Sequence, residues 1–411
     1  LTEGALVAGQ PNGASSWFPC DDHPSAKASF RIQIATESAY LTLANGKLLS
    51  RRARAGMTTW TYEQSEPTST YLITLQIGPY TRRRMAKNGV EIFSVLPDRL
   101  RREFDHDFGR QPQMMKLFVK LFGPYPLADG YTVVVTDDDL EIPLEAQGIS
   151  IFGANHCDGR RGSERLVAHE LAHQWFGNSV TAQRWRHIWL HEGFACYAEW
   201  LWSDHCGERS ADDWARHYHR RLVDSPQDLV LADPGPQDMF DDRVYKRGAL
   251  ALHTLRRRIG DDSFFALLRE WTSRYRHASV VTDDFIALAA QYTEDSLRPL
   301  WAAWLYSAEV PALDLPGPTP PPAHPGPSPA AVWCASGRRP RCRRCAGTRC
   351  CIWPPGISSR PASRCSACSG ARSGWPAEPR SACCRRAPVR SARHGASRAA
   401  AVRCASVRAS G

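Results

Sequence analysis

Alternating apolar and polar residues fill much of the first 79 positions and predict short β-strands. The clearest stretches are Ser29 to Ile34, Leu41 to Leu43 and Tyr71 to Ile77, and Asn, Gly and Pro residues that favour turns separate them. Two later apolar stretches, Tyr131 to Val135 and Ile149 to Phe152, predict strands on either side of an acidic loop. We therefore expect a β-rich beginning followed by a small further sheet.

From residue 163 onward, apolar positions recur with the period of a helix. Ser163 can cap a helix that continues to Phe176 and ends at Gly177 and Asn178. A second helix, rich in tryptophan, is predicted from Ile188 to Trp202. Helices are also predicted over four later ranges: Tyr245 to Arg258, Asp262 to Tyr275, Thr282 to Tyr292 and Ser296 to Tyr306. Strands first and helices afterwards predict an α+β fold.

The chain changes character after Leu315. A proline-rich stretch leads into Arg, Ala, Ser, Pro and Cys, and the segment has no Leu, Phe or Tyr from which to build a core. We predict three parts: residues 1–79, a remnant of an N-terminal β domain; residues 80–315, a mixed domain; and residues 316–411, a disordered low-complexity tail. The tail uses the residues of GC-rich codons, which favours a shifted reading frame, and the opening at Leu1 resembles the middle of a domain.

The net charge of +10 is concentrated in the tail. Residues 316–411 hold 17 Arg and one acid, Glu378, so they carry +16 and the first 315 residues carry −6. An acidic body gives no reason to expect a nucleic-acid partner. No apolar run approaches the ~20 residues that cross a bilayer, so no membrane partner is expected. Four scattered cysteines in the body do not form a disulfide scaffold and favour a cytoplasmic location: Cys20, Cys157, Cys196 and Cys206.

Two alternative interpretations of the tail are weaker. Cys342 and Cys345 form one C-x2-C pair, and Cys365 and Cys368 form another after 19 residues, which is a zinc-ribbon spacing. Cysteine and arginine are so dense here that such spacings arise by accident, and the apolar residues that a ribbon packs around its metal are missing. An RNA-binding tail is disfavoured because arginine without interleaved aromatics provides no stacking platform.

The run from His169 to His173 reads His-Glu-Leu-Ala-His, which is the H-E-x-x-H pattern. Residues four apart share one face of a helix, so the two imidazoles can converge on one zinc at about 2.0–2.1 Å. Glu170 lies one position round the helix, where a carboxylate can act as general base toward a water molecule. A bare pattern of this kind arises by chance in about one chain in a hundred of this length, so a third ligand is needed to support it.

The second predicted helix supplies that ligand. Catalytic zinc takes three protein ligands and keeps an open position. Glu192 lies in the run Trp-Leu-His-Glu-Gly-Phe-Ala, and eighteen residues separate it from His173. We therefore predict one Zn²⁺ per chain, bound by His169, His173 and Glu192. His191 points about 100° away from Glu192 on the helix and is not expected to be a ligand.

These motifs resemble the aminopeptidase N family of gluzincin zinc metallopeptidases. The matching segments are HELAHQWFGN at residues 169–178 and WLHEGFA at residues 189–195, together with the gap between them. Three other stretches agree: Trp17 to Lys27 (WFPCDDHPSAK), Phe122 to Pro126 (FGPYP) and Tyr245 to Ala249 (YKRGA). The resemblance covers Gln10 to about Leu315. It implies a partial antiparallel β domain followed by a thermolysin-like, mainly helical catalytic domain.

The resemblance also implies roles for two residues outside the metal motif. Glu199, seven residues after Glu192, would orient a zinc-binding histidine. In isolation it would be read as a solvated helix residue. Tyr245 matches the family tyrosine whose hydroxyl stabilises the oxyanion, whereas an isolated tyrosine would be read as a packed aromatic.

A third implied feature is a site for the substrate's α-amino group. In the family, a glutamate in a Gly-Ala-Met-Glu-Asn motif binds this group, and Ile142 to Ala146 keeps only that glutamate, Glu145. A carboxylate facing an ammonium group would require a free N-terminus. The following strand, Ile149 to Phe152, is expected to pair with the peptide backbone. Gln10 stands nine residues before Pro19, where the family has a substrate-contacting glutamine, although its flanking residues differ.

The function expected from these residues is that of a zinc-dependent aminopeptidase acting on peptides with a free N-terminus. Three alternatives remain open. A zinc endopeptidase would need an open cleft without an amine anchor. An epoxide hydrolase with secondary peptidase activity would need a lipid tunnel and an arginine from a further C-terminal domain. A catalytically silent or misfolded product is the non-enzyme alternative.

Overall fold

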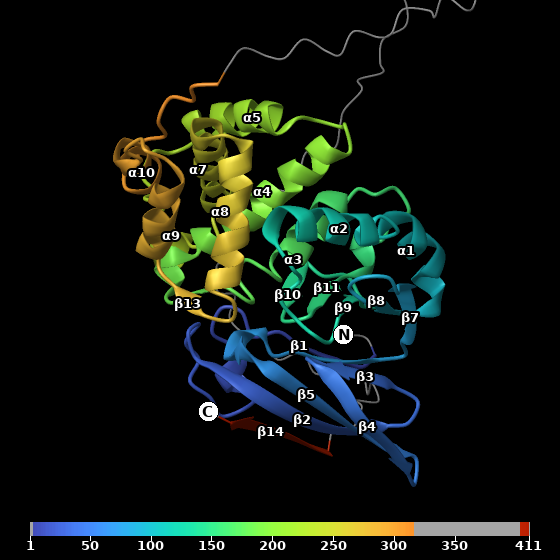
Figure 1. Cartoon of the computed structure of the whole chain (residues 1–411). Helices are drawn as coiled ribbons and strands as arrows, with labels where there is room; N and C mark the ends of the chain where they lie inside the picture. The colour runs from blue at the N-terminus through green and yellow to red at the C-terminus, as the bar shows by residue number, and fades with distance from the viewer. Residues whose placement is uncertain (1–2, 316–402, 411) are drawn as a thin grey trace, which may run out of the picture. The chain divides into compact units, whose positions relative to one another are not determined.

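The computed structural model describes residues 3–315, together with the backbone of residues 403–410 (Figure 1). Strands dominate up to residue 96 and helices dominate from residue 164 to residue 305. The predicted α+β fold, with a β-rich N-terminal part followed by a helical part, is confirmed.

Two antiparallel sheets form the N-terminal part. Strand β2 shows why they pack together: Phe30, Ile32 and Ile34 are buried, while Arg31 and Gln33 between them are exposed. The buried side chains meet apolar residues of the other sheet, including Leu43 and Ile77, in one core. One sheet has the order β1 (Ala5–Val7), β6 (Leu75–Gly78), β3 (Leu41–Ala44), and the other contains β2 (Lys27–Glu37), β5 (Met57–Ser69) and β4 (Lys47–Arg54).

Strand β14 (Arg403–Ser410) pairs antiparallel with β2 and extends the second sheet at its edge. For these eight residues the expectation of a tail without secondary structure is wrong. The edge of β2 presents unpaired backbone N–H and C=O groups, and a segment without proline can pair with them whatever its side chains are. The remaining tail, including the cysteines considered for a zinc ribbon, lies outside the described residues.

A five-stranded mixed sheet follows, with the order β10-β11-β9-β8-β7. Its central strands β8, β9 and β11 are parallel, and β10 and β7 are the antiparallel edges. Strand β11 pairs on both sides, so the expectation that it pairs with substrate is wrong, and β10 is the edge strand on that side. The bounds are β7 (Thr81–Ala86), β8 (Ile92–Leu96), β9 (Tyr131–Val135), β10 (Leu144–Ala146) and β11 (Ile149–Phe152).

Helices surround the remaining core, and all six ranges predicted from the sequence contain one. Helix α3 ends at Ala172, before the predicted Phe176, because Gln174 and Trp175 form tighter bonds to carbonyls three residues earlier. Several short or polar helices were not predicted. The bounds are α1 (Arg101–Asp107), α2 (Gln111–Phe122), α3 (Glu164–Ala172), α4 (Trp189–His205), α5 (Ala211–Val223), α6 (Gly235–Asp238), α7 (Asp242–Ile259), α8 (Asp261–Arg274), α9 (Thr282–Ala289) and α10 (Arg298–Leu305).

Helices α4 and α7 approach each other closely at two glycines. A Cβ atom added to Gly193 would lie 2.8 Å from Gly248 Cα, and one added to Gly248 would lie 2.7 Å from Gly193 Cα. Any side chain at either position would push the helices apart. This contact brings the start of α7, with Tyr245, next to the residues of α4.

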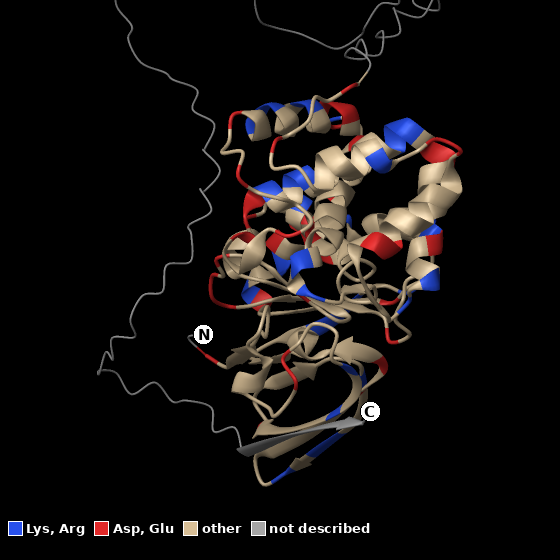
Figure 2. Ribbon diagram, turned by 90° about the vertical axis from the view of Figure 1, so that its left-hand side faces the viewer, with Lys and Arg blue, Asp and Glu red and all other residues tan. Residues whose placement is uncertain are grey.

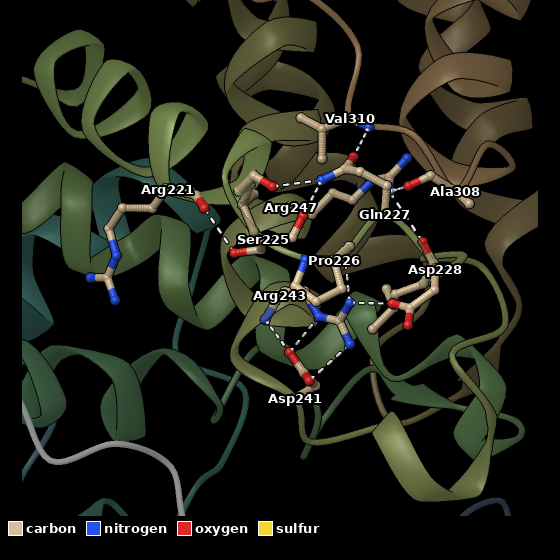
Figure 3. Close-up of polar contacts among 12 residues, drawn as sticks. Arg221, Ser225, Pro226, Gln227, Asp228, Asp241, Arg243, Arg247, Ala308 and Val310 are labelled. Atoms are coloured by element: carbon tan, nitrogen blue, oxygen red, sulfur yellow. Dashed lines mark hydrogen bonds and ion pairs between the residues drawn. The ribbon is translucent and has the colours of Figure 1, made fainter.

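Arg247 fixes a different face of α7. Its buried guanidinium donates to backbone carbonyls at the end of α10 and just beyond it, including Trp304 O at 2.9 Å and Ala308 O at 2.8 Å. Figure 3 shows this cluster, in which Val310 N also donates to Gln227 Oε1 at 2.7 Å. Carbonyls at a helix C-terminus lack helical partners, and a buried arginine can satisfy several of them. Arg247 therefore holds α7 in place through a second set of contacts, next to the one with α4.

Candidate active site

His169 and Glu170 on α3, His173 at its end and Glu192 on α4 form one buried cluster. The Nε2 atoms of His169 and His173 lie 3.3 and 3.5 Å from Glu192 Oε2. One potential ligand atom from each of the three residues lies within 4.8 Å of the others. The structure thus brings together the three residues predicted as metal ligands.

The geometry of this cluster fits zinc. Bonds of about 2.0–2.1 Å in a tetrahedral site place neighbouring ligand atoms about 3.3–3.4 Å apart, close to the separations seen here. His173 Nδ1 lies 3.0 Å from Phe176 O and His169 Nδ1 lies 2.8 Å from Glu199 Oε1. Each Nδ1–H donates to its oxygen, so both Nε2 lone pairs remain available for a metal. The set of two imidazoles and one carboxylate is typical of catalytic zinc.

Glu199 lies two turns along α4 from Glu192, and its contact with His169 is the one expected from the sequence. Burial opposes its charge, but the nearby Lys246 and Arg165 outweigh this and lower the pKa of Glu199 to about 2. Lys246 is itself buried, on α7. Glu199 is therefore an ionised acceptor for His169 Nδ1–H across the neutral pH range.

The protonation of the histidines reflects the same carboxylates. Burial disfavours charge on His169, but hydrogen bonds to Glu192 and Glu199 raise its pKa to about 9. Glu145 and Glu192 similarly outweigh burial at His173 and raise its pKa to about 10. Zinc binds only the neutral rings, so loading this site releases protons.

Glu170 lies beside the ligands without being one of the three. It is buried, and its Oε2 atom has no hydrogen-bond partner among the described residues. Burial, together with the charges of Glu145 and Glu192, raises the pKa of Glu170 to about 8, against the opposing effect of the two histidines. A divalent cation next to it would lower that pKa again. A carboxylate oxygen without a hydrogen-bond partner, next to the candidate zinc ligands, can exchange a proton with a water molecule at the same place.

Tyr245 reaches the cluster from α7. Its ring lies 5.9 Å from the ring of His169, with an angle of 23° between the planes. Burial and the charges of Glu192 and Glu145 raise the pKa of Tyr245 well above its usual value. The hydroxyl is therefore protonated and can donate a hydrogen bond.

Glu145 and Gln10 meet although 135 positions separate them. Glu145 lies on the edge strand β10, and Gln10 Nε2 donates to Glu145 Oε1 at 2.5 Å. Both residues line a small pocket that also includes Tyr71 and Leu144. Burial raises the pKa of Glu145, with His173 opposing this and Glu192 adding to it. A substrate ammonium group would compensate this buried carboxylate.

Two residues that were not predicted individually connect the metal helix to β10. Gln174 accepts from Gly148 N at 2.8 Å and donates to Ala146 O at 3.2 Å. Asn178 Nδ2 also donates to Ala146 O, at 2.9 Å. These bonds hold the hairpin of β10 and β11, and so Glu145, against the end of the metal helix. Both residues belong to the HELAHQWFGN segment, and the resemblance of this segment to the family was the sequence evidence that could have indicated their role.

Lys27 connects the N-terminal sheets to the same region. Its ammonium group donates to Ser179 O at 2.8 Å, Ala278 O at 3.2 Å and Asn178 O at 3.4 Å. The Trp17 to Lys27 segment thus ends on the loop that follows the metal-binding histidines. Its place in the resemblance was the only sequence signal for this contact.

His191 makes a structural contact. Its Nε2 accepts from Ala182 N at 2.6 Å, and burial lowers its pKa to about 3. The ring is therefore neutral, and its Nε2 atom is already engaged by a backbone N–H group.

The fold and this cluster define a class: zinc metallopeptidases of the H-E-x-x-H type, with a glutamate from a second helix as third ligand. The family model of the peptidase family M1 domain matches residues 110–304, and that of the M1 N-terminal domain matches residues 5–72. A crystal structure of an M1 zinc metallopeptidase from Deinococcus radiodurans is 30% identical, with a TM-score of 0.69, and the match covers 76% of this chain and 72% of that chain. The chain belongs to peptidase family M1.

Two curated relatives of this chain are named aminopeptidases. Aminopeptidase M1-D of Oryza sativa subsp. japonica is 26% identical over 326 residues, covering 72% of this chain and 36% of the relative. Human endoplasmic reticulum aminopeptidase 1 is 27% identical over 296 residues, covering 67% of this chain and 31% of the relative. The chain thus spans about a third of the length of these relatives. Native yeast LTA4 hydrolase, at 21% identity and a TM-score of 0.65, shares the fold.

Among the residues that the structure describes, every helix is too short or too polar to cross a bilayer.

Proposed function

We propose that this chain is a zinc-dependent aminopeptidase that removes the N-terminal residue from peptides. The observation that carries the proposal is a buried glutamate pair with two different surroundings. Glu170 lies beside the three candidate zinc ligands, and its Oε2 atom has no hydrogen-bond partner among the described residues. Glu145 lies on the edge strand of the sheet, next to Gln10. One can exchange protons at the scissile bond, and the other can bind the amine that makes the enzyme an exopeptidase.

His169, His173 and Glu192 would hold the metal. Zinc at such a site supplies Lewis acidity, which polarises a carbonyl and lowers the pKa of water to about 7. Glu170 accepts a proton from the attacking water and passes it to the leaving amine. Tyr245 donates a hydrogen bond to the carbonyl oxygen as that oxygen becomes negative. Glu199 orients the ring of His169 through Nδ1–H.

The substrate would bind with its ammonium group against Glu145 and Gln10. The free edge of β10 offers backbone groups with which an extended peptide can pair. In support, a mutant of an M1 zinc metallopeptidase from Deinococcus radiodurans, 30% identical with a TM-score of 0.69, forms a crystal structure with a bound Tyr-Ser-Ala substrate. We propose a catalytic domain over residues 80–315, since β6 ends at Gly78 in one sheet and β7 begins at Thr81 in the next.

A cytoplasmic location is also a proposal. It is supported by the four cysteines of the body, which are all unpaired: Cys20, Cys157, Cys196 and Cys206. Reducing compartments keep thiols in this state.

The test is hydrolysis of a panel of amino-acid arylamides by the zinc-loaded protein and by Glu170→Gln. We expect activity that a chelator removes, and a loss of about 10²–10⁴-fold in kcat for the variant with its zinc content unchanged. Full activity in Glu170→Gln with zinc bound would reject the assignment of the base. A purified wild type without zinc or activity would favour the silent alternative.

A comparison of free and N-acetylated forms of one peptide separates the exopeptidase from an endopeptidase. We expect cleavage of the free form alone. Equal rates on both would favour the endopeptidase, because an acetylated N-terminus cannot pair with Glu145.

A further inference from the structure

A second cavity lies at the far edge of the mixed sheet. It has a volume of about 310 Å³ and is lined by residues of β7, β8, α1 and the start of α2: Arg83, Arg84, Met85, Ser94, Arg101, Asp105, Gly109 and Pro112. Three arginines face a single acid in this lining, which leaves a formal charge of +2. Basic and acidic positions are interspersed along the helices, whereas basic positions predominate along β4 (Lys47–Arg54) (Figure 2).

The arginines of β7 are not neutralised by strong pairs. Arg83 Nη2 lies 3.4 Å from Asp98 Oδ1, and Arg84 Nη2 lies 3.2 Å from Glu91 Oε1. All four side chains are about half exposed to solvent. Exposed pairs of this kind contribute little and can exchange partners. Both guanidinium groups are therefore available to an incoming anion.

Arg101 provides the most specific feature. Its side chain is 13% exposed, and only Nη1 has a partner, Ser94 Oγ at 2.9 Å, since Asp105 lies at 3.9 Å. Nε and Nη2 are buried and have no hydrogen-bond partner among the described residues. The N–H groups on these two atoms form one edge of the guanidinium, the fork that binds both oxygens of a carboxylate or phosphate. Leaving buried donors of a charged group unpaired is costly.

The surroundings of Arg101 also indicate a missing negative charge. Burial lowers its pKa and the nearby positive charge of Arg83 lowers it further, and the negative charges of Asp105 and Asp98 offset this only in part. Two guanidinium groups close enough to repel each other are stabilised by an anion placed between them. The cavity volume falls at the lower end of the range for small-molecule sites.

We propose that this cavity binds a small oxyanion, the phosphate or carboxylate group of a small molecule, through the guanidinium groups of the arginines that line it, Arg83, Arg84 and Arg101. The site is separate from the metal cluster. Glu145 lies on β10 at one edge of the sheet and Arg83 lies on β7 at the other, four strand spacings or about 19 Å away. Binding here leaves the catalytic groups in place, so it is independent of the proposed peptidase activity.

The experiment is isothermal titration of the full-length, zinc-loaded chain with sodium phosphate, with sodium citrate and with sodium chloride at matched ionic strength. We expect phosphate, citrate or both to bind and chloride to give no binding isotherm. Arg101→Gln should weaken binding about tenfold or more, because it removes one of the three positive charges of the lining and a charge-assisted contact. The matched control, Arg102→Gln, removes the same charge from the exposed neighbouring position of α1 and should bind like the wild type.

Binding of phosphate alone would identify a phosphate-bearing ligand, and binding of citrate alone a carboxylate-bearing one. An absence of binding to both, or equal affinity in Arg101→Gln and Arg102→Gln, would overturn the proposal. If Arg101→Gln does not fold, the double variant Arg83→Gln/Arg84→Gln is titrated instead. We expect it to bind phosphate or citrate more weakly than the wild type. Arylamide hydrolysis by each variant should match the wild type, and since titration reads binding directly, failure of the peptidase proposal would not affect the result.

Discussion

The metal-binding half of the candidate site and the half that faces the substrate amine are built in different ways. His169, Glu170, His173 and Glu192 come from two adjacent helices within 24 positions of sequence. Glu145 and Gln10 lie 135 positions apart and meet only because the N-terminal sheets lie beside β10. Local helix geometry is enough for the first half, whereas the second depends on contacts between distant segments. The first should therefore tolerate changes elsewhere better than the second.

The largest expected effect among the variants that probe this contrast is that of Tyr245→Phe. It leaves the packing against His169 in place and removes only the hydroxyl. We expect kcat for arylamide hydrolysis to fall about 10²–10³-fold with little change in KM, because the lost hydrogen bond forms as charge develops on the oxygen. Tyr275→Phe, which alters a tyrosine packed on Trp271, should behave like the wild type. A mutant Tyr245→Phe with a wild-type kcat would exclude the hydroxyl from catalysis.

Glu145→Gln tests the half assembled from distant segments. It keeps the size of the side chain and removes the charge that faces the ammonium group. We expect kcat/KM for free peptides to fall about 10–100-fold, as for loss of a charge-assisted bond of about 1.5–3 kcal/mol. Glu141→Gln, an exposed acid on the preceding loop, is the control and should have no effect. If both variants lose the same activity, general charge rather than a specific amine contact is responsible.

Glu199→Gln tests the support of the metal. A glutamine can still accept from His169 Nδ1–H but no longer carries the charge that favours this orientation. We expect zinc to dissociate about 10–100-fold more readily, measured by competition with a chromogenic chelator. Asp204→Asn changes an exposed acid on the same helix and should leave zinc affinity unchanged. Unchanged affinity in Glu199→Gln would show that this contact does not support the metal.

The smallest expected effect lies outside both halves, at His277. Burial, with Arg276 and Lys27 nearby, lowers its pKa to about 4. The neutral ring is the form favoured by folding, so stability is full above pH 6.5 and falls as pH drops toward 4. The ring is only partly buried, and solvent screening reduces the energy that corresponds to this shift. We therefore expect His277→Asn to lose about 1–2 kcal/mol less stability than the wild type between pH 7 and pH 4, since asparagine tolerates the backbone φ of 60° there. Urea unfolding at pH 7 and pH 4 measures it, and parallel losses in both proteins would contradict this cause.

The convergence of His169, His173 and Glu192 could be predicted from sequence because helix periodicity is local. The strands Tyr131 to Val135 and Ile149 to Phe152 were also predicted with the bounds that the structure shows. Their pairing was not: β11 proved to be an interior strand, because the free edge of a sheet depends on partners distant in sequence. Helix α2 was not predicted.

The contact between Gln10 and Glu145 could be expected only from the family resemblance, since no local pattern connects the two residues. The same holds for Lys27, whose three carbonyl acceptors come from two separate loops. Long-range contacts of this kind require the packed structure. The arginine cavity is a further example, because its lining comes from two strands and two helices.

The most direct measurement is anomalous X-ray diffraction from crystals of the zinc-loaded protein, above and below the zinc absorption edge. Within residues 3–315 we predict one zinc peak, about 2.0–2.1 Å from the Nε2 atoms of His169 and His173. Glu192 should be the third ligand of this zinc ion. A peak elsewhere, or a Glu192 side chain turned away from a metal held by the two histidines, would contradict the proposed site.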